Sequence, residues 1–141
     1  MIHEGRVLLI KRGKEPLRGR WVVPGGTVEL GESLEQALVR EMEEETALRV
    51  RPGDVVSVFD RIERIDGRVR YHYVIVDYLC TYVGGVARAA SDALEVAWAA
   101  PEDLAGFDLP SKALEVVEEA FRRSLTPKDL PAGPPGPILL K

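Results

Sequence analysis

Four glutamates occur within five residues of this sequence, at Glu41, Glu43, Glu44 and Glu45. They lie near the end of a segment whose pattern predicts a helix. Like charges at helical spacing repel each other by roughly 0.2–0.5 kcal/mol per pair, and carboxylates near a helix C-terminus oppose the helix dipole. The cluster therefore disfavours the helix that carries it, unless another group compensates its charge.

A helical wheel separates these glutamates by direction. The inward face of the first half of the helix is defined by Leu34, Ala37 and Leu38. Glu41 and Glu45 continue the same line, Glu44 lies at its edge, and Glu43 points to solvent. A run of glutamates is usually a solvated face, which accounts for Glu43 but not for the inward acids.

Unpaired burial of a carboxylate costs several kcal/mol or forces protonation, and Arg40 alone cannot balance three acids. A divalent cation can, and oxygen ligands select hard ions such as Mg²⁺ or Mn²⁺.

Two glycines, Gly25 and Gly26, follow Pro24 directly ahead of this helix. Glycine lets the backbone adopt unusual φ values and approach the helix closely. The main-chain carbonyl of Gly25 is therefore a candidate for an additional hard metal ligand. The alternative is a plain tight turn without a ligand role.

Composition places the chain among ordinary globular proteins. It has 141 residues, 45% hydrophobic and 30% charged, which fits one domain with a real core. A net charge of −4 gives no general attraction to nucleic acid or anionic membranes, and no apolar run approaches the ~20 residues of a membrane span. No secretory signal is visible, and the single cysteine, Cys80, is expected in the core of a strand, so a cytoplasmic protein is the expectation.

Hydrophobic patterning predicts strands and two long helices in mixed order. The predicted strands are residues 6–11, 21–23 with an extended continuation to 30, 50–59 broken by a turn at 51–54, 69–83, and 94–99. The predicted helices are residues 33–46, capped by Ser33 and Gln36, a short turn at 101–104, and 110–125. Asp66-Gly67 predicts a hairpin turn. The order indicates a mixed α/β sandwich rather than a regular βαβ array.

A long spaced motif covers residues 26–48. It contains Gly26, Glu32, Arg40-Glu41, Glu44-Glu45 and the closing Leu48. This motif resembles the Nudix box, and Trp21 to Gly25 resemble the usual lead-in of that family. The resemblance implies an α/β/α sandwich with a mixed β-sheet, one catalytic helix and a C-terminal helix. The expected Nudix domain spans residues 1–125, followed by a Pro/Gly-rich tail at 126–141.

The resemblance also implies a reaction, which is metal-dependent hydrolysis of a pyrophosphate bond in a nucleoside diphosphate derivative. By this likeness Glu41, Glu44 and Glu45 are the metal ligands, with the Gly25 carbonyl as a further one. Arg40 would orient these glutamates as part of the catalytic set. Glu32 would contact the ligand residues without binding the metal itself. The candidates for the general base are Glu41 in the box, or Asp92 or Glu95 on a later loop, which could equally be solvated positions.

Substrate contacts are less defined by the sequence. Arg12, Arg18 and Arg20 are candidates for holding phosphate, and Tyr71 is a candidate for stacking on a base. The segment around Tyr71 resembles the ADP-ribose-pyrophosphatase-like branch, although a proline that many members carry is absent. ADP-ribose or another nucleotide sugar is the first expectation and nucleoside triphosphates the second, while a nucleotide-sensing domain without catalysis is the alternative of another class.

Two positions depart from the family pattern. Ala47 stands where the family has a helix-ending glycine, at an expected cost of about 1 kcal/mol if the left-handed turn is kept. A strand that usually precedes residues 6–11 is missing, which leaves the aliphatic residues 7–10 as an expected open edge. Either the true start of the protein lies upstream and supplies that strand, or the edge is covered by the tail, with its apolar residues 138–140, or by a second protomer. A homodimer with residues 1–11 or 137–141 near the contact is therefore a hypothesis.

Overall fold

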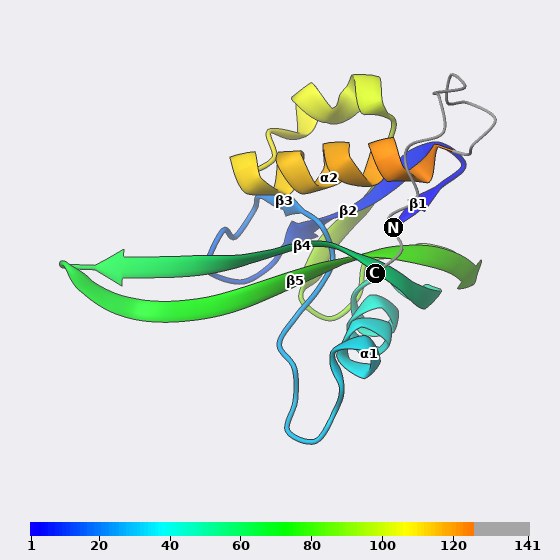
Figure 1. Ribbon diagram of the computed structural model, residues 1–141. Coiled ribbons are helices and arrows are strands. Elements are labelled where there is room, and N and C mark those ends of the chain that lie inside the picture. Colours follow the sequence, from blue (N-terminus) through cyan, green and yellow to red (C-terminus); the bar gives the residue numbers. More distant parts are fainter. Residues whose placement is uncertain (126–141) are drawn as a thin grey trace, which may run out of the picture.

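Strand β2 (Arg6–Arg12) is the central strand of a four-stranded sheet in the computed structural model, which describes residues 1–125 (Figure 1). β6 (Ala93–Ala99) pairs with one of its edges, and β1 (Ile2–His3) and β3 (Trp21–Val22) pair with the other, all antiparallel. The expectation of an open edge at residues 7–10 is therefore wrong. Residues 2 and 3 are enough to supply the first partner strand, and residues 7–10 are at most 2% exposed.

Strands β4 (Arg49–Ile65) and β5 (Arg68–Gly84) form a long antiparallel hairpin. Its turn is at Asp66-Gly67, as predicted, and both residues have positive φ. The turn predicted at residues 51–54 is absent, because β4 continues through this segment as a strand. The pairing is instead irregular between Pro52 and Val55, as in a β-bulge, which tolerates a proline that has no N–H to donate.

Helices α1 (Leu34–Thr46) and α2 (Ser111–Ser124) lie on opposite sides of the strands (Figure 1), and the 3₁₀ helix η1 (Pro101–Phe107) precedes α2. Neighbouring residues of β2 point to the two sides. Leu9 packs with Val117 of α2, whereas Leu8 packs with Met42 of α1. These two cores on either face of the strands confirm the α/β/α sandwich.

The boundaries of α1 follow its sequence signals. Ser33 and Gln36 form the predicted capping box, in which the Ser33 hydroxyl accepts from the Gln36 N–H and the Gln36 side chain accepts from the Ser33 N–H. Ala47 ends the helix with φ +59°, so alanine keeps the left-handed turn that glycine would favour. The extended continuation predicted for residues 27–30 forms no strand; the Thr27 carbonyl accepts instead from the Arg40 side chain.

Cys80 lies in the core beside α1, at 5% exposure, as the sequence predicted. Among residues 1–125, no helix is long and apolar enough to cross a membrane. The predicted tail at 126–141 lies outside the described residues.

Candidate active site

Arg40 is the centre of the acidic motif. Its guanidinium donates to both carboxylate oxygens of Glu32 at 2.6 and 3.1 Å, to Glu41 at 2.9 Å and to Glu44 at 3.1 Å. It also donates to the Thr27 carbonyl at 3.0 Å. The hydrogen bonds with Glu32 and Glu41 raise the pKa of Arg40, and the same contact lowers the pKa of Glu32. Arg40 thereby fixes the loop before α1 to the helix and orients Glu41.

Glu45 is the most enclosed of the acids, with 6% exposure. One carboxylate oxygen, Oε2, accepts the backbone N–H of Gly25 at 3.0 Å. Burial raises the pKa of Glu45 to about 7, although the Gly25 hydrogen bond opposes the shift; the Glu41 charge adds to it. Glu45 is therefore a carboxylate whose charge the protein leaves only partly compensated.

Glu41 lies against the glycine turn. A Cβ atom built on Gly26 would come within 2.2 Å of the Glu41 carboxyl group. Glycine at this position is therefore what lets the carboxylate rest against the backbone. Glu45 thus contacts Gly25 and Glu41 contacts Gly26. The sequence predicted this close approach of the two glycines to the helix.

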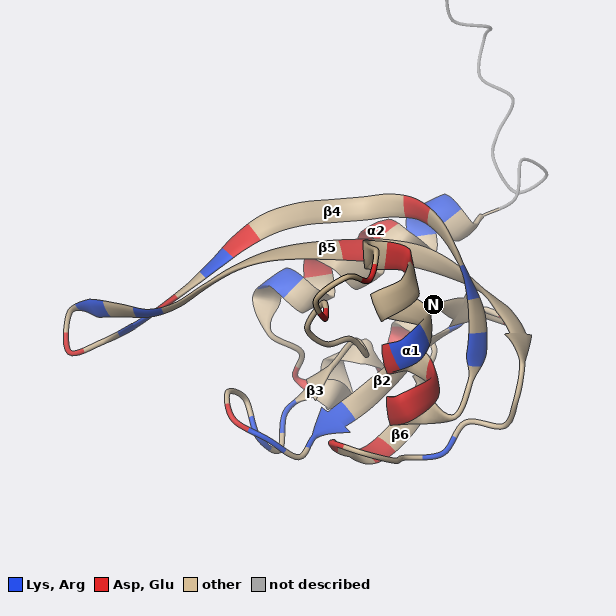
Figure 2. Ribbon diagram, turned by 90° about the horizontal axis from the view of Figure 1, so that it is seen from below, with Lys and Arg blue, Asp and Glu red and all other residues tan. Residues whose placement is uncertain are grey.

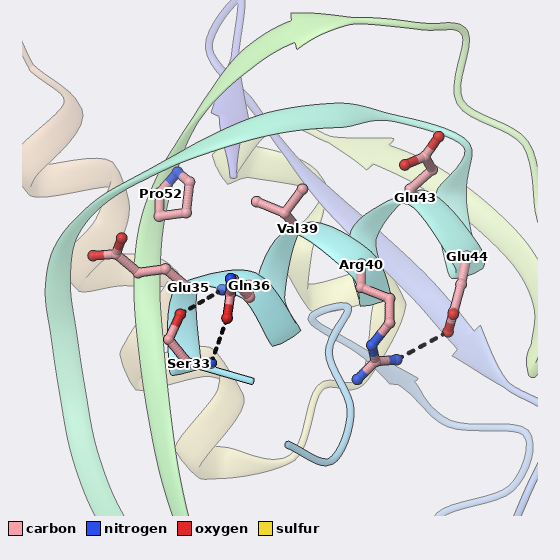
Figure 3. Close-up of a pocket in the computed structure, with 8 residues that line it drawn as sticks. All are labelled: Ser33, Glu35, Gln36, Val39, Arg40, Glu43, Glu44 and Pro52. Carbon is pink, nitrogen blue, oxygen red and sulfur yellow. Dashed lines mark hydrogen bonds and ion pairs between the residues drawn. The ribbon is translucent and has the colours of Figure 1, made fainter. Parts of the chain in front are cut away.

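Glu43 and Glu44 differ from these two. Glu43 is exposed, in agreement with the helical wheel, whereas the Glu44 side chain is 48% exposed and less inward than predicted. Its i,i+4 pairing with Arg40 holds Glu44 at the outer side of α1. Figure 3 shows Arg40 reaching toward Glu44 while Glu43 points elsewhere.

Two hollows flank α1. A cleft of about 1320 Å³ lies between the glycine turn, α1, the β4–β5 hairpin and the start of α2, and both Glu41 and Glu45 line it. A smaller hollow of about 770 Å³ lies at the outer side of α1, where Arg40, Glu43 and Glu44 line it together with Pro52 (Figure 3). The large cleft is the candidate active site because it holds the two most enclosed acids of α1.

Of the predicted phosphate contacts, only Arg12 lines the cleft. Its Nε donates to the Pro16 carbonyl at 2.8 Å. Arg20 is turned away and donates to the backbone carbonyl of Asp108 at 2.8 Å, while Arg18 is exposed outside the cleft lining.

Asp92 lies on the loop before β6, as predicted, whereas Glu95 lies within β6 and not on a loop. Lysines pair with both acids. Asp92 lines the cleft and pairs with Lys14 at 2.8 Å, whereas Glu95 lies outside the lining and pairs with Lys11 at 2.9 Å. The Asp92 carbonyl also accepts the Gly13 N–H at 2.7 Å, so the Lys14 loop and the Asp92 loop are held together. Sequence reasoning missed Lys14, whose only signal was its place among the basic residues of that loop.

Aromatic residues of the hairpin form another part of the lining. Tyr71 lies on the hairpin outside the cleft lining and stacks on Tyr73, with ring centroids 5.7 Å apart. Tyr73 and Phe59 do line the cleft, and Lys112 lies 5.1 Å from the centre of the Phe59 ring. The sequence offered no signal to prefer Tyr73 over Tyr71, because both positions lie on the same face of one strand.

The acids suit a divalent cation by their chemistry. Within residues 1–125 no three Asp, Glu, His or Cys side chains converge as a preformed ligand set, and the Arg40 guanidinium lies between Glu41 and Glu44. The available donors are nonetheless all oxygens, and Glu45 is buried with one N–H partner and a charge that is only partly compensated. Such a donor set fits a hard ion, with Glu41, Glu44 and Glu45 as the residues that would hold it.

Comparison with known proteins shows the family of this chain. Residues 2–123 match the NUDIX domain family. The chain is 36% identical over 92 residues to an ADP-ribose pyrophosphatase of Methanocaldococcus jannaschii, covering 65% of this chain and 53% of that protein. It is 30% identical over 139 residues to the human 8-oxo-dGDP phosphatase NUDT18, covering 91% of this chain and 41% of that protein. The chain thus spans about half the length of the curated relatives it matches.

Solved structures show the same fold. The crystal structure of a MutT NUDIX hydrolase from Burkholderia pseudomallei superimposes with a TM-score of 0.73 at 31% identity, covering 84% of this chain and 91% of that one. The NUDIX domain of Shewanella oneidensis NrtR, in a complex with ADP-ribose, superimposes with a TM-score of 0.67 at 26% identity, covering 84% of this chain and 77% of that one. The motif, the sandwich and these matches together show that this chain belongs to the NUDIX family.

Proposed function

We propose that this protein hydrolyses a pyrophosphate bond in a nucleoside diphosphate derivative, with Mg²⁺ or Mn²⁺ as the cofactor. The observation that carries the proposal is the buried carboxylate of Glu45, which lies with Glu41 at the Gly25-Gly26 turn of the large cleft. A bound divalent ion supplies charge neutralisation of the phosphate oxygens and a more acidic water.

The protein's own residues do the positioning. Glu41 and Glu45, which line the cleft, would hold the ion, with the Gly25 carbonyl as a further candidate ligand. Glu44 would have to leave Arg40 and turn from the outer side of α1 to join them, and Arg40 fixes the direction of Glu41. Arg12, in the cleft wall, holds a phosphate oxygen of the substrate by charge.

Proton transfer from water needs a carboxylate within the cleft. Glu41 is the box candidate and Asp92 the loop candidate, and both line the cleft. Asp92 has to leave Lys14 to serve as a base, whereas Glu41 has only to shift within its contact with Arg40. Glu41 is therefore the preferred base in this proposal, and Glu95 is disfavoured because it lies outside the lining.

For the substrate, ADP-ribose or another nucleotide sugar is the first candidate. The Methanocaldococcus relative is named an ADP-ribose pyrophosphatase, and the Shewanella domain was solved with ADP-ribose. Oxidised purine nucleotides are the second candidate, because the human relative is named an 8-oxo-dGDP phosphatase and a relative from Bacillus subtilis a putative 8-oxo-dGTP diphosphatase. A sensing role without catalysis is disfavoured by the full set of motif acids.

The test is a phosphate-release screen of the purified protein with Mg²⁺ and with Mn²⁺. The substrates are ADP-ribose, nucleotide sugars and dinucleotides, with a coupled phosphatase that acts only on their products, and nucleoside triphosphates, with a coupled inorganic pyrophosphatase. 8-oxo-dGDP is assayed without a coupling enzyme, because its hydrolysis releases phosphate directly. We expect hydrolysis that EDTA abolishes, strongest for ADP-ribose or a nucleotide sugar. Binding of these compounds without turnover under any condition would support the sensing role instead.

The matched variants are Glu45→Gln and Glu43→Gln. Glu45→Gln is expected to lower kcat at least 100-fold, because the most enclosed ligand is lost, whereas Glu43→Gln, on the solvent side of the same helix, should change it less than twofold. Equal damage from the two substitutions would contradict the assignment of the cleft as the active site.

A further inference from the structure

The outer half of the β4–β5 hairpin extends away from the rest of the molecule (Figures 1 and 2). An isolated two-stranded hairpin is marginally stable in water unless another surface packs on it. This one exposes large aliphatic side chains to solvent, namely Val58 at 60%, Ile62 at 48%, Ile65 at 54%, Val69 at 49% and Val74 at 67%. The hairpin therefore offers apolar side chains that a neighbouring strand on the same sheet can contact side by side.

The outer edge of β4 is also unpaired. Among the residues that the structure describes, β4 pairs with β5 and with no other strand. Natural proteins usually protect such an edge, because its free N–H and C=O groups recruit further strands. In the inner half of β4, the Arg123 side chain donates to the Val55 carbonyl at 2.9 Å. Ile62 and its neighbours lie further along the strand, beyond that contact.

The order of charges along this edge is self-complementary. If a second copy of β4 is laid antiparallel, with Ile62 facing its own counterpart, Asp60 faces Arg64 and Arg61 faces Glu63. Facing residues share one side of the sheet, and opposite charges placed there stabilise the pairing. One step further out, Phe59 faces Ile65, so the next pair on each side is apolar. Red and blue bands alternate along this part of β4 in Figure 2.

Strand β5 lacks this property. Its outer half carries Arg68, Arg70 and His72 and no acid before Asp77. Antiparallel pairing of β5 with its own copy would bring like charges together, which is destabilising. The favoured partner for the hairpin is therefore a second β4, and not a second β5.

We propose that two copies of this protein associate through antiparallel pairing of β4 with β4 around Ile62. The result is a continuous four-stranded intermolecular sheet in the order β5, β4, β4 of the partner, β5 of the partner. The existing pairs of Asp60 with His72 and of Arg61 with Glu63, both at 2.8 Å, remain on the outer faces, because carboxylates accept more than one hydrogen bond. The contact is short, so the dimer dissociates on dilution.

The test uses the complete chain and measures its mass over a range of concentrations by analytical ultracentrifugation. We expect the wild type to change from dimer to monomer on dilution. Arg64→Glu places like charges opposite each other at two symmetric positions, and Asp60→Arg does the same with the other sign, so each variant should weaken the dimer at least tenfold. Arg70→Glu makes the same charge change on the neighbouring strand and should leave the dimer unchanged.

Mixing the two single variants gives the decisive result. In a pair with one Arg64→Glu chain and one Asp60→Arg chain, every facing charge is again opposite, so the heterodimer should form with about the wild-type affinity although each variant alone dimerises at least tenfold more weakly. The double variant Asp60→Arg/Arg64→Glu should likewise recover the dimer. A monomeric wild type at every concentration, or a dimer that ignores these substitutions while circular dichroism shows all variants folded, would overturn the proposal.

Discussion

Glu45 is a buried carboxylate whose charge the protein compensates only in part, through the Gly25 N–H and the nearby Arg12 charge. Its raised pKa, about 7 against 4.5, means that its charge costs stability above pH 7. Glu45→Gln is therefore expected to raise the melting temperature in EDTA at pH 8 by several degrees. Added Mg²⁺ should stabilise the wild type by binding the native state and should have a smaller effect on the variant.

Thermal unfolding of both proteins, with Glu43→Gln as the exposed control, checks this expectation. A wild-type melting curve that is the same in EDTA and in millimolar Mg²⁺ would contradict the metal site.

Asp77 is a second acid with a raised pKa, and it lines the large cleft from strand β5. Burial is the main cause, and positive charges nearby, including Lys112, oppose it. Because the folded pKa lies above the unfolded value of 3.8, the protonated form favours the native state and the stability contribution is lost as pH rises through the folded pKa. Asp77→Asn should therefore raise the melting temperature at pH 7 by a few degrees, and this gain should shrink as the pH falls toward 4.

Melting curves of the wild type and Asp77→Asn between pH 4 and 8 measure this dependence. The exposed Asp54→Asn serves as the control, and its curve should follow the wild type at each pH. A gain for Asp77→Asn that grows on acidification would show the opposite sign of the shift.

The C-terminal end of helix α1 contains a strained backbone conformation that a substitution can relieve. Ala47 holds φ +59°, a conformation that glycine adopts without steric cost. Ala47→Gly is expected to stabilise the protein by up to about 1 kcal/mol, and Ala47→Val to destabilise it by more than that, since β-branched residues fit this region worst. Urea unfolding of the three proteins provides the measurement, and an Ala47→Gly variant less stable than the wild type would show that the turn is not strained.

At the turn before α1, a substitution of Gly26 is expected to affect activity but not stability. A Cβ at position 26 would collide with the Glu41 carboxyl group, which is the mobile end of a side chain and can move aside. Gly26→Ala should therefore leave the melting temperature nearly unchanged but lower metal-dependent hydrolysis at least tenfold. Gly106→Ala, where the added atom meets nothing within 4 Å, should change neither. Equal activities of the two variants would show that the position of Glu41 does not matter.

Local signals in the sequence were enough to predict several of these elements. The capping box sets the start of α1, Asp66-Gly67 sets the hairpin turn, and the helical period separates Glu45 from Glu43. The Pro52 segment was mistaken for a turn, because a bulge depends on the partner strand and not on the local residues.

Long-range contacts of the site could not be predicted in the same way. The carbonyl of Asp108 holds Arg20 across 88 positions, and Asp92 holds Lys14 across the cleft wall. Neither spacing leaves a pattern in the sequence. Arg12 and Arg20 are thus similar in sequence context, and only the fold distinguishes the one in the cleft from the one outside it.

For the whole molecule, the two cores consist of residues between Val7 and Val117, with partly buried neighbours from Met1 to Phe121. We therefore expect that a chain shortened to residues 1–125 folds with a melting temperature within about 3 °C of the full chain. Differential scanning calorimetry of the two chains compares them. A large loss of stability would show that residues 126–141 contribute to the fold.

Strand β2 is bonded on both edges and buried on both faces, and this arrangement affects how the molecule opens. Its amide hydrogens point alternately to the two edges, so each one is protected by a single neighbour. The Leu8 N–H donates to the Met1 carbonyl, so fraying of the two-residue strand β1 is enough to free it. The Leu9 N–H points to the other edge, where β6 pairs along β2 from Val7 to Arg12, and deuterium uptake at Leu9 therefore reports a much larger opening of the sandwich. The amides of the β4–β5 turn, by contrast, exchange through local opening, so one labelling experiment on this chain separates its most and least protected segments.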